Sequence, residues 1–309
     1  MENEQMDAPH AALKSKTLWL SLFTWAVVLL VSDLPNAIWQ AILGEPPAWL
    51  FWVKIGFLGV LILISLFWKP IKIVCPYFFL LLVLMLALWG MNWLRGTSAY
   101  SQWENNVNWV IAMAGYQLLK LAVVLIMIVV LLLIGRRWKD FFLTRGHLNA
   151  PIRPMKPEGN PSKRSISWGT LGLILGLCIM PLTLLFFGIG DLPISNILIK
   201  ALPYFPAALL FAATNAFAEE VQFRASLLGD LQKAIGPDQA IWLTATFFGF
   251  AHYFGGAPAG IPGVLIAGLL GALFAKCMLG SKGIVVPWFI HFCQNAVIYA
   301  FWAIGSVAA

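Results

Sequence analysis

Long apolar stretches alternate with short polar connections along the whole chain. The apolar stretches lie near residues 17–43, 49–68, 75–94, 107–134, 168–190, 194–224, 239–254, 262–279 and 284–305. A helix needs roughly 20 apolar residues to cross about 30 Å of hydrocarbon, and inside a bilayer it satisfies its own backbone hydrogen bonds. The pattern therefore predicts an all-α fold, a polytopic transmembrane helix bundle with about nine spanning helices.

Composition supports a lipid environment. Of the 309 residues, 61% are hydrophobic and 11% are charged, which is more apolar surface than a water-soluble core of this size can bury. The N-terminal residues lead into the first apolar stretch without a small-residue cleavage site, so we expect a retained first helix rather than a signal peptide. We therefore expect a multi-pass integral membrane protein, in a bacterial cytoplasmic membrane, with the lipid bilayer as its surroundings.

Basic residues concentrate in the connection 135–167. They are Arg136, Arg137, Lys139, Arg145, Arg153, Lys156, Lys163 and Arg164, against Asp140 and Glu158. By the positive-inside rule this loop is cytoplasmic, and counting back over four spans makes the N-terminus cytoplasmic as well. The net charge of +7 is explained by such connections, and we expect no nucleic-acid partner.

The same loop divides the predicted organisation into parts. Residues 1–134 form an N-terminal four-helix membrane portion of unknown role, and residues 168–309 form a C-terminal portion that carries the candidate site. Within the N-terminal portion the polar residues Asp33, Lys54 and Lys120 are explained by packing or by snorkelling, in which a long side chain carries its charge to the membrane surface. We assign this portion no chemistry.

Glu219 and Glu220 are the only glutamates after residue 158, and they follow an apolar run in which an ionisable group is costly. Glu220 and Arg224 are four residues apart, so they share a helix face and can form an ion pair. Glu219 points about 100° away and lacks that helical partner. Glu219 is therefore the better candidate for a general base, while solvated charges at an interfacial helix end are the alternative.

Of the four histidines, His252 and His291 lie within predicted spans. Phe248 precedes His252 by one turn, so its ring can orient or shield the imidazole. His291 and Asn295 also lie one turn apart, and two donors on one face can stabilise the oxyanion of a tetrahedral intermediate. Taken singly, each histidine is also explained by a structural hydrogen bond between helices.

Together these groups supply the parts that water needs to attack an amide. EEVQFR fits EExxxR, Phe248 to His252 fits FxxxH, and His291 to Asn295 fits HxxxN. In this order on apolar helices, the motifs resemble the CPBP family of intramembrane proteases, which includes type II CAAX prenyl proteases and bacteriocin-processing or self-immunity (Abi-like) proteins. The resemblance covers roughly residues 168–305.

The resemblance implies a membrane helix bundle that hydrolyses a peptide bond, and we expect no cofactor, because Asn295 and Arg224 have natural roles in a metal-free scheme. It implies that Glu219 and His252 activate the attacking water, and that His291 and Asn295 form the oxyanion hole. The supporting residues would be Glu220, Arg224 and Phe248. The expected substrate is a peptide or a lipidated protein, of the CAAX type or otherwise associated with the membrane.

Three other functions stay open on the sequence. Zinc held by Glu219, His252 and His291 would make the protein an intramembrane metalloprotease. A non-catalytic immunity or peptide-binding protein would keep the polar cluster for packing or binding. A transporter could use intramembrane acids and histidines as a proton relay, although the two portions show no inverted repeat.

One consequence of the predicted topology concerns depth. If helix 239–254 ran straight outward, His252 would lie near the outer face while Glu219 lay near the inner end of its helix. A shared site requires one depth. We therefore expect the segment 225–238 to be interfacial or re-entrant, or helix 239–254 to be tilted or broken.

Overall fold

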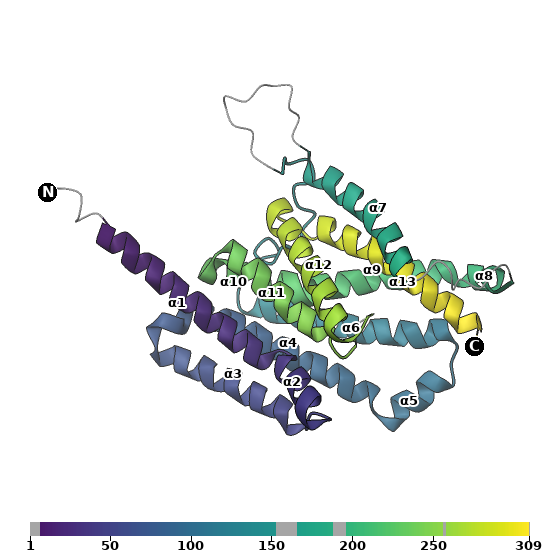
Figure 1. The fold of residues 1–309 in the computed structure, drawn as a ribbon, viewed down its shortest axis with the longest axis horizontal. Helices are drawn as coiled ribbons and strands as arrows, with labels where there is room; N and C mark the ends of the chain where they lie inside the picture. Colours follow the sequence, from purple (N-terminus) through teal and green to yellow (C-terminus); the bar gives the residue numbers. More distant parts are fainter. Residues whose placement is uncertain (1–6, 153–165, 188–195, 256–257, 309) are drawn as a thin grey trace. The chain divides into compact units, whose positions relative to one another are not determined.

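The structure is a computed structural model that describes residues 7–152, 166–187, 196–255 and 258–308, with the backbone alone for residues 7–17, 187 and 196. The described residues are almost entirely helical (Figure 1). The α-helices are α1 (Asp7–Val31), α2 (Leu34–Leu43), α3 (Trp49–Phe67), α4 (Cys75–Arg95), α5 (Ser98–Asn105), α6 (Trp109–Leu133), α7 (Trp168–Phe187), α8 (Asn196–Ala201), α9 (Phe205–Glu220), α10 (Ser226–Ile235), α11 (Pro237–Ala251), α12 (Gly260–Ser281) and α13 (Val285–Ala308). The shorter elements are η1 (Lys69–Val74), η3 (Leu202–Tyr204) and a π-helical turn η4 (Val221–Ala225).

The helical membrane fold is confirmed. Among the described residues, 7 helical segments are long and apolar enough to cross a membrane, or up to 8 when the bent pair α1 and α2 counts as one span. The predicted segment 239–254 is the one that drops out, because α11 has 15 residues. A helix of that length measures about 22 Å, which is shorter than the roughly 30 Å hydrocarbon core.

The first predicted helix, 17–43, is broken in the structure. Its two parts, Leu18–Val31 and Leu34–Leu43, are bent by 49°. Proline lacks a backbone N–H and its ring clashes with the carbonyl four residues earlier. For Pro35 that carbonyl belongs to Val31, the last residue of α1. The break therefore has a local cause that the sequence contains.

The described chain forms two compact units, each built from segments on both sides of the basic loop. Unit 1 comprises residues 1–86 and 227–275, and unit 2 comprises residues 87–226 and 276–309. Residues 153–165 of the predicted basic loop lie outside the described residues. The proposed division of the sequence at 134 and 168 stays a prediction.

Unit 2 is organised around α13, which packs against α9 and α7, while α6 packs against α9 and η4 (Figure 1). Small residues make the approach of α9 and α13 close, since Ala208, Ala212 and Ala303 are at most 1% exposed in their shared cluster. Small side chains let membrane helices pack with their backbones near one another. The Trp288 indole donates to the Ala213 carbonyl at 3.0 Å and fixes α13 along α9.

Unit 1 places α1 against α2, α3 and α11. The Trp25 indole donates to Gln239 Oε1 at 2.8 Å, which joins α1 to the start of α11. Gly249 lies against α12, where a Cβ would come within 2.7 Å of the Val264 carbonyl oxygen. A glycine is therefore required for this contact, and it fixes the end of α11, one turn before the His252 turn.

Most of the segment 225–238 is helical. Through η4 the chain continues from α9 into α10, and the helical run Ile197–Ile235 contains a stretch that is apolar enough to cross a membrane. The run ends at Gly236, whose φ of +86° favours glycine, and Pro237 then begins α11. Whether 225–238 lies at the membrane interface stays a prediction, as does the alternative that the helix over 239–254 is tilted, although α11 ends at Ala251 rather than at residue 254.

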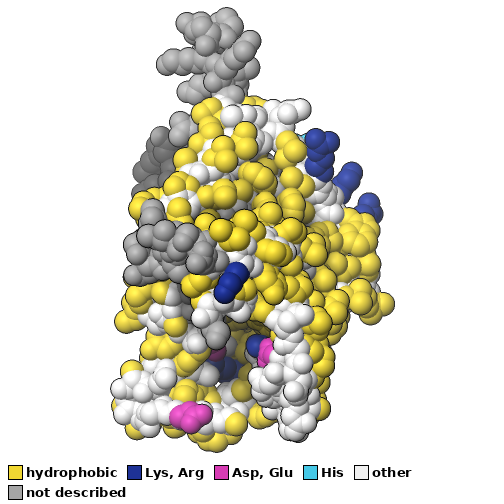
Figure 2. Space-filling model, turned by 90° about the vertical axis from the view of Figure 1, so that its right-hand side faces the viewer, with side chains coloured by type: hydrophobic (Ala, Val, Ile, Leu, Met, Phe, Trp, Pro, Cys, Tyr) yellow, Lys and Arg dark blue, Asp and Glu magenta, His cyan; other side chains and the backbone are white. Residues whose placement is uncertain are grey.

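Apolar side chains cover much of the surface of the described helices. Leu63, Leu125 and Leu177, near the middle of α3, α6 and α7, are 61%, 62% and 58% exposed. The face drawn in Figure 2 is mainly hydrophobic and carries few charged side chains. Exposed apolar surface of this extent is costly in water and is expected for helices that face lipid.

Candidate active site

The EExxxR segment lies where α9 passes into the π turn. Glu219 and Glu220 end α9, and the next five residues, Val221–Ala225, form η4 and are all buried. A π turn widens the helix by one residue and is frequent at functional sites. Here the turn keeps the polar side chains of Gln222 and Arg224 buried in the protein. Gln222 Nε2 donates to the Lys120 carbonyl oxygen at 3.0 Å.

The adjacent glutamates face two different helices. Glu220 continues the row of Ala208 and Ala212, spaced four residues apart, which packs against α13. Glu219 follows Asn215 by four residues and faces α6. Successive residues of a helix point about 100° apart, so the two adjacent glutamates can face α6 and α13 from the same turn of α9.

Glu220 is held in a buried ionic cluster. Arg224 donates from Nη1 to Glu220 Oε1 at 2.7 Å, with side-chain exposures of 1% and 0%. His291 Nδ1 lies 2.8 Å from the same oxygen, and because a carboxylate oxygen accepts, Nδ1 donates. The predicted Glu220–Arg224 ion pair is confirmed. Glu220 is completely buried, and Arg224 and His291 both donate to the same one of its oxygens.

Glu219 has a counter-ion after all. Lys120, from α6, donates from Nζ to Glu219 Oε1 at 2.9 Å, with side-chain exposures of 11% and 12%. Asn215 Nδ2 donates to the same oxygen at 3.0 Å, and Asn215 Oδ1 accepts from Lys120. Lys120 is therefore packed in the interior, and it does not snorkel to the membrane surface. Glu219 lacks a cation on its own helix, as expected, but it has one on α6.

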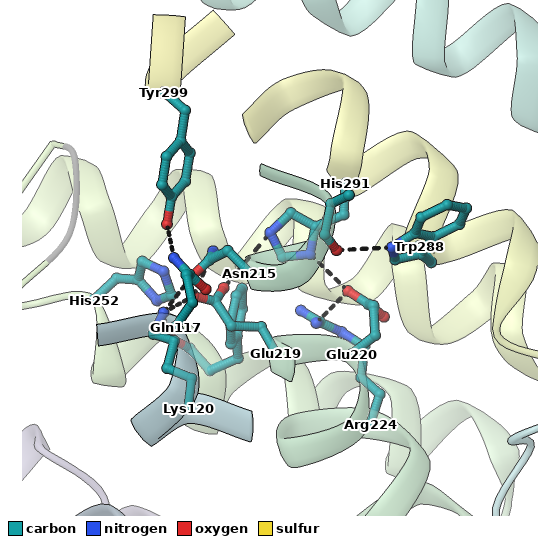
Figure 3. Close-up of polar contacts among 12 residues, drawn as sticks. Gln117, Lys120, Asn215, Glu219, Glu220, Arg224, His252, Trp288, His291 and Tyr299 are labelled. Atoms are coloured by element: carbon teal, nitrogen blue, oxygen red, sulfur yellow. Dashed lines mark hydrogen bonds and ion pairs between the residues drawn. The ribbon is translucent and has the colours of Figure 1, made fainter. Parts of the chain in front are cut away.

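His291 lies between the two carboxylates, as Figure 3 shows. Its Nδ1 is fixed by Glu220, and its Nε2 lies 3.5 Å from Glu219 Oε2. The Trp288 contact, one turn earlier on α13, holds this part of the helix against α9. The two carboxylates, Lys120 and Arg224 balance in charge, which lowers the cost of burying the group.

Asn295 lies one turn beyond His291 and is 5% exposed. Among the described residues, its buried Nδ2 has no hydrogen-bond partner. A buried donor without an acceptor costs about 1–3 kcal/mol, so its retention calls for a reason. Four residues further on, the Tyr299 hydroxyl accepts a hydrogen bond from Gln117 Nε2 at 2.7 Å, which joins α13 to α6 (Figure 3).

His252 follows α11 and belongs to unit 1. Its Nδ1 lies 2.9 Å from the Phe248 carbonyl oxygen, and the two rings are 4.4 Å apart in an edge-to-face arrangement. Since a carbonyl oxygen only accepts, Nδ1 is the donor in this contact. The expected contact with Phe248 is confirmed, whereas the shared action of His252 and Glu219 stays a prediction.

The structure therefore brings together four of the predicted site residues, Glu219, Glu220, Arg224 and His291, and places Asn295 one turn away on α13. Sequence reasoning missed Lys120, Asn215, Gln117 and Tyr299. The missed signal is spacing, since Gln117 and Lys120 lie three residues apart on one face of α6, and Asn215 precedes Glu219 by four residues.

Metal binding was the alternative for Glu219, His252 and His291. Within the described ranges, no group of three or more His, Cys, Asp or Glu side chains is arranged so that it could hold a metal ion. His291 lies beside two glutamates, but the negative charges of these glutamates are balanced by Lys120 and Arg224. Such cations disfavour a further positive charge at the same oxygens.

The chain was compared with known families, proteins and structures. Residues 200–297 match the family model described as type II CAAX prenyl endopeptidase Rce1-like. The match includes the three motifs and η4, while α6 lies outside it. No curated protein and no solved structure matches the chain.

Proposed function

We propose that the chain hydrolyses a peptide bond with water activated at Glu219. The premise is that the chain belongs, through residues 200–297, to the Rce1-like family of CAAX-type intramembrane proteases. Glu219 lies at the end of α9, is partly exposed, and is bound by donors on one oxygen. A base must reach water and keep its charge, and the 12% exposure of Glu219 and the nearby Lys120 ammonium support this role. Glu220, which is fully buried, supports the site without touching the substrate.

The reaction proceeds by direct attack of water. Glu219 takes a proton from the water, whose oxygen bonds to the carbonyl carbon, and the carbonyl oxygen becomes an oxyanion. When the intermediate collapses, the C–N bond breaks and the proton held on Glu219 passes to the leaving nitrogen. His252 assists the activation of water, as the resemblance implies.

The oxyanion is stabilised by Asn295 and His291. Because His291 Nδ1 donates to Glu220, its donor to the oxyanion is Nε2, which requires a proton on both ring nitrogens. The observation that carries this assignment is the buried Asn295 Nδ2, which lacks an acceptor within the described part of the chain. A carbonyl oxygen that gains negative charge would supply that acceptor. A preorganised donor in a water-poor site contributes most where charge develops in the transition state.

The proposed substrate is a membrane-associated peptide, and a prenylated peptide ending in a CAAX sequence is the first probe. The N-terminus and the connection after α6 are cytoplasmic in this proposal, because Arg136, Arg137 and Lys139 follow α6 directly. Reporter fusions at the N-terminus and at residue 150 would both be active on the cytoplasmic side. A reporter at residue 150 that is active outside would reverse the orientation.

The function is tested by comparing membrane peptides from cells that make the parent chain or the Glu219→Gln variant. Glutamine keeps the size and much of the hydrogen bonding but removes the base. We expect peptide products in the parent that are missing in the variant. An identical biological effect of both chains, with identical peptides, would favour a binding or immunity protein. Inactivation by a strong chelator that zinc reverses would favour the metalloprotease.

A further inference from the structure

The ion pair between α6 and α9 extends the proposed active site beyond the part of the chain that matches the family. We propose that Lys120 is a positioning residue that holds Glu219 charged and oriented for attack by water. This inference rests on the proposed function. It assigns a role in the reaction to a helix of the N-terminal portion, for which the sequence indicated none.

The contacts around Lys120 form a closed triangle. Its ammonium donates to both Asn215 Oδ1 and Glu219 Oε1, and Asn215 donates to the same Glu219 oxygen. Two donors therefore occupy Oε1. With Oε1 fixed, the carboxylate plane is fixed too, and Oε2 is the atom that lies 3.5 Å from His291 Nε2.

The backbone that carries Lys120 is tied to the same site. Asn108 caps α6, because its Oδ1 accepts from the Ile111 N–H at 3.0 Å. Gln222 in the π turn donates to the carbonyl oxygen of Lys120 itself, and Gln117 donates to Tyr299 on α13. Helix α6 is thus bound to η4 and α13, two of the elements that supply site residues, so the ammonium has little freedom to leave.

Electrostatics gives this geometry a consequence for the reaction. Removing a carboxylate from water is costly, and a cation within hydrogen-bond distance offsets that cost by stabilising the charged form. A base must be charged to accept a proton from water. Without the ammonium, the population of charged and correctly oriented Glu219 falls, although the groups that bind the peptide are unchanged. The loss should therefore appear in kcat more than in KM.

The test uses the full chain in liposomes with a farnesylated peptide that ends in a CAAX sequence. We expect Lys120→Met to lower kcat on the order of tenfold to a thousandfold and to change KM by less than about threefold. Lys120→Arg retains the charge and should recover a large part of kcat. The matched control is Lys54→Met, a second buried lysine on a membrane helix, and its kcat should equal that of the parent.

The outcomes separate this inference from the function on which it rests. An active parent and an inactive Glu219→Gln variant support the function. If Lys120→Met then retains the parent kcat, or if Lys120→Arg is no better than Lys120→Met, the positioning role is overturned and the function stands. A Glu219→Gln variant with the parent's activity overturns the function itself.

A second measurement covers the case in which Lys120→Met unfolds. Removing the ammonium leaves the Glu219 charge uncompensated, and Glu219→Gln removes that charge. The thermal midpoint of the double variant in detergent should therefore lie above that of Lys120→Met alone. If the two substitutions lower the midpoint additively, Lys120 and Glu219 are not coupled and the inference fails.

Discussion

Two buried lysines on membrane helices have very different surroundings. Lys54 on α3 donates to the Ser32 carbonyl and to Asn36 Oδ1, and lies 4.0 Å from Asp33. These partners belong to the break between α1 and α2, where helix carbonyls lack their usual donors. Lys54 therefore supplies hydrogen-bond donors to polar groups at the helix break.

Lys120 on α6 has a different kind of partner, a carboxylate in the EExxxR motif. The two side chains are comparably buried, at 5% and 11% exposed, so burial does not distinguish them. The two lysines differ in the identity of the partner. A buried lysine that satisfies backbone carbonyls affects stability, whereas one that pairs with a candidate base affects the reaction.

Arg224→Met should be the most disruptive change in the ionic cluster, whose two ion pairs are Lys120–Glu219 and Arg224–Glu220. It leaves Glu220 buried at 0% exposure without its cation, and breaking such a pair costs about 3–5 kcal/mol. Expression and thermal stability in detergent would both fall. Arg224→Lys is the control and should recover part of the stability. A stable, fully active Arg224→Met variant would show that the cluster is not held by charge.

Asn295→Ala should affect the reaction rather than the fold. Its Nδ2 has no acceptor among the described residues, so little stabilising contact is lost. Loss of one oxyanion donor typically costs about 10²–10³ in kcat. The measurement is kcat on the peptide beside the thermal midpoint. A variant that loses stability but keeps kcat would make Asn295 a packing residue.

Lys54→Met should lower stability alone. The Ser32 carbonyl and the Asn36 side chain would each lose a donor, at a cost of about 1–3 kcal/mol in total. The thermal midpoint should fall while kcat stays at the parent value. A loss of kcat as large as that of Lys120→Met would remove the contrast between the two lysines.

Trp288→Phe should have the smallest effect. It removes one hydrogen bond, from the indole to the Ala213 carbonyl, worth about 0.5–1.5 kcal/mol, and leaves an aromatic ring in place. Since Trp288 precedes His291 by one turn, a small decrease in kcat is expected with a slight loss of stability. Steady-state kinetics and thermal unfolding would measure both.

Much of the fold was predictable because hydrophobic length determines membrane spans. The exception, α11, is apolar but ends at the His252 turn before it reaches spanning length. The break at Pro35 could also have been predicted, since a proline inside a helical pattern removes a hydrogen bond. The π turn could not, because EExxxR has the same spacing in a continuous α-helix.

The site was predictable where its partners lie on one helix. The Glu220–Arg224 pair follows from a separation of four residues, and so does the shared face of His291 and Asn295. Lys120 and Glu219 are 99 residues apart, and no local pattern joins them. Only packing of α6 against α9 brings the ammonium to the carboxylate, and the sequence does not specify which helices pack together.

The most direct test of the account is the rate of peptide hydrolysis by purified parent and Glu219→Gln chains in the same liposomes. If Glu219 is the base, kcat should fall by about 10²–10⁴ while the variant unfolds near the parent temperature. A variant that cleaves the peptide within about threefold of the parent rate would contradict the assignment of Glu219 as the general base.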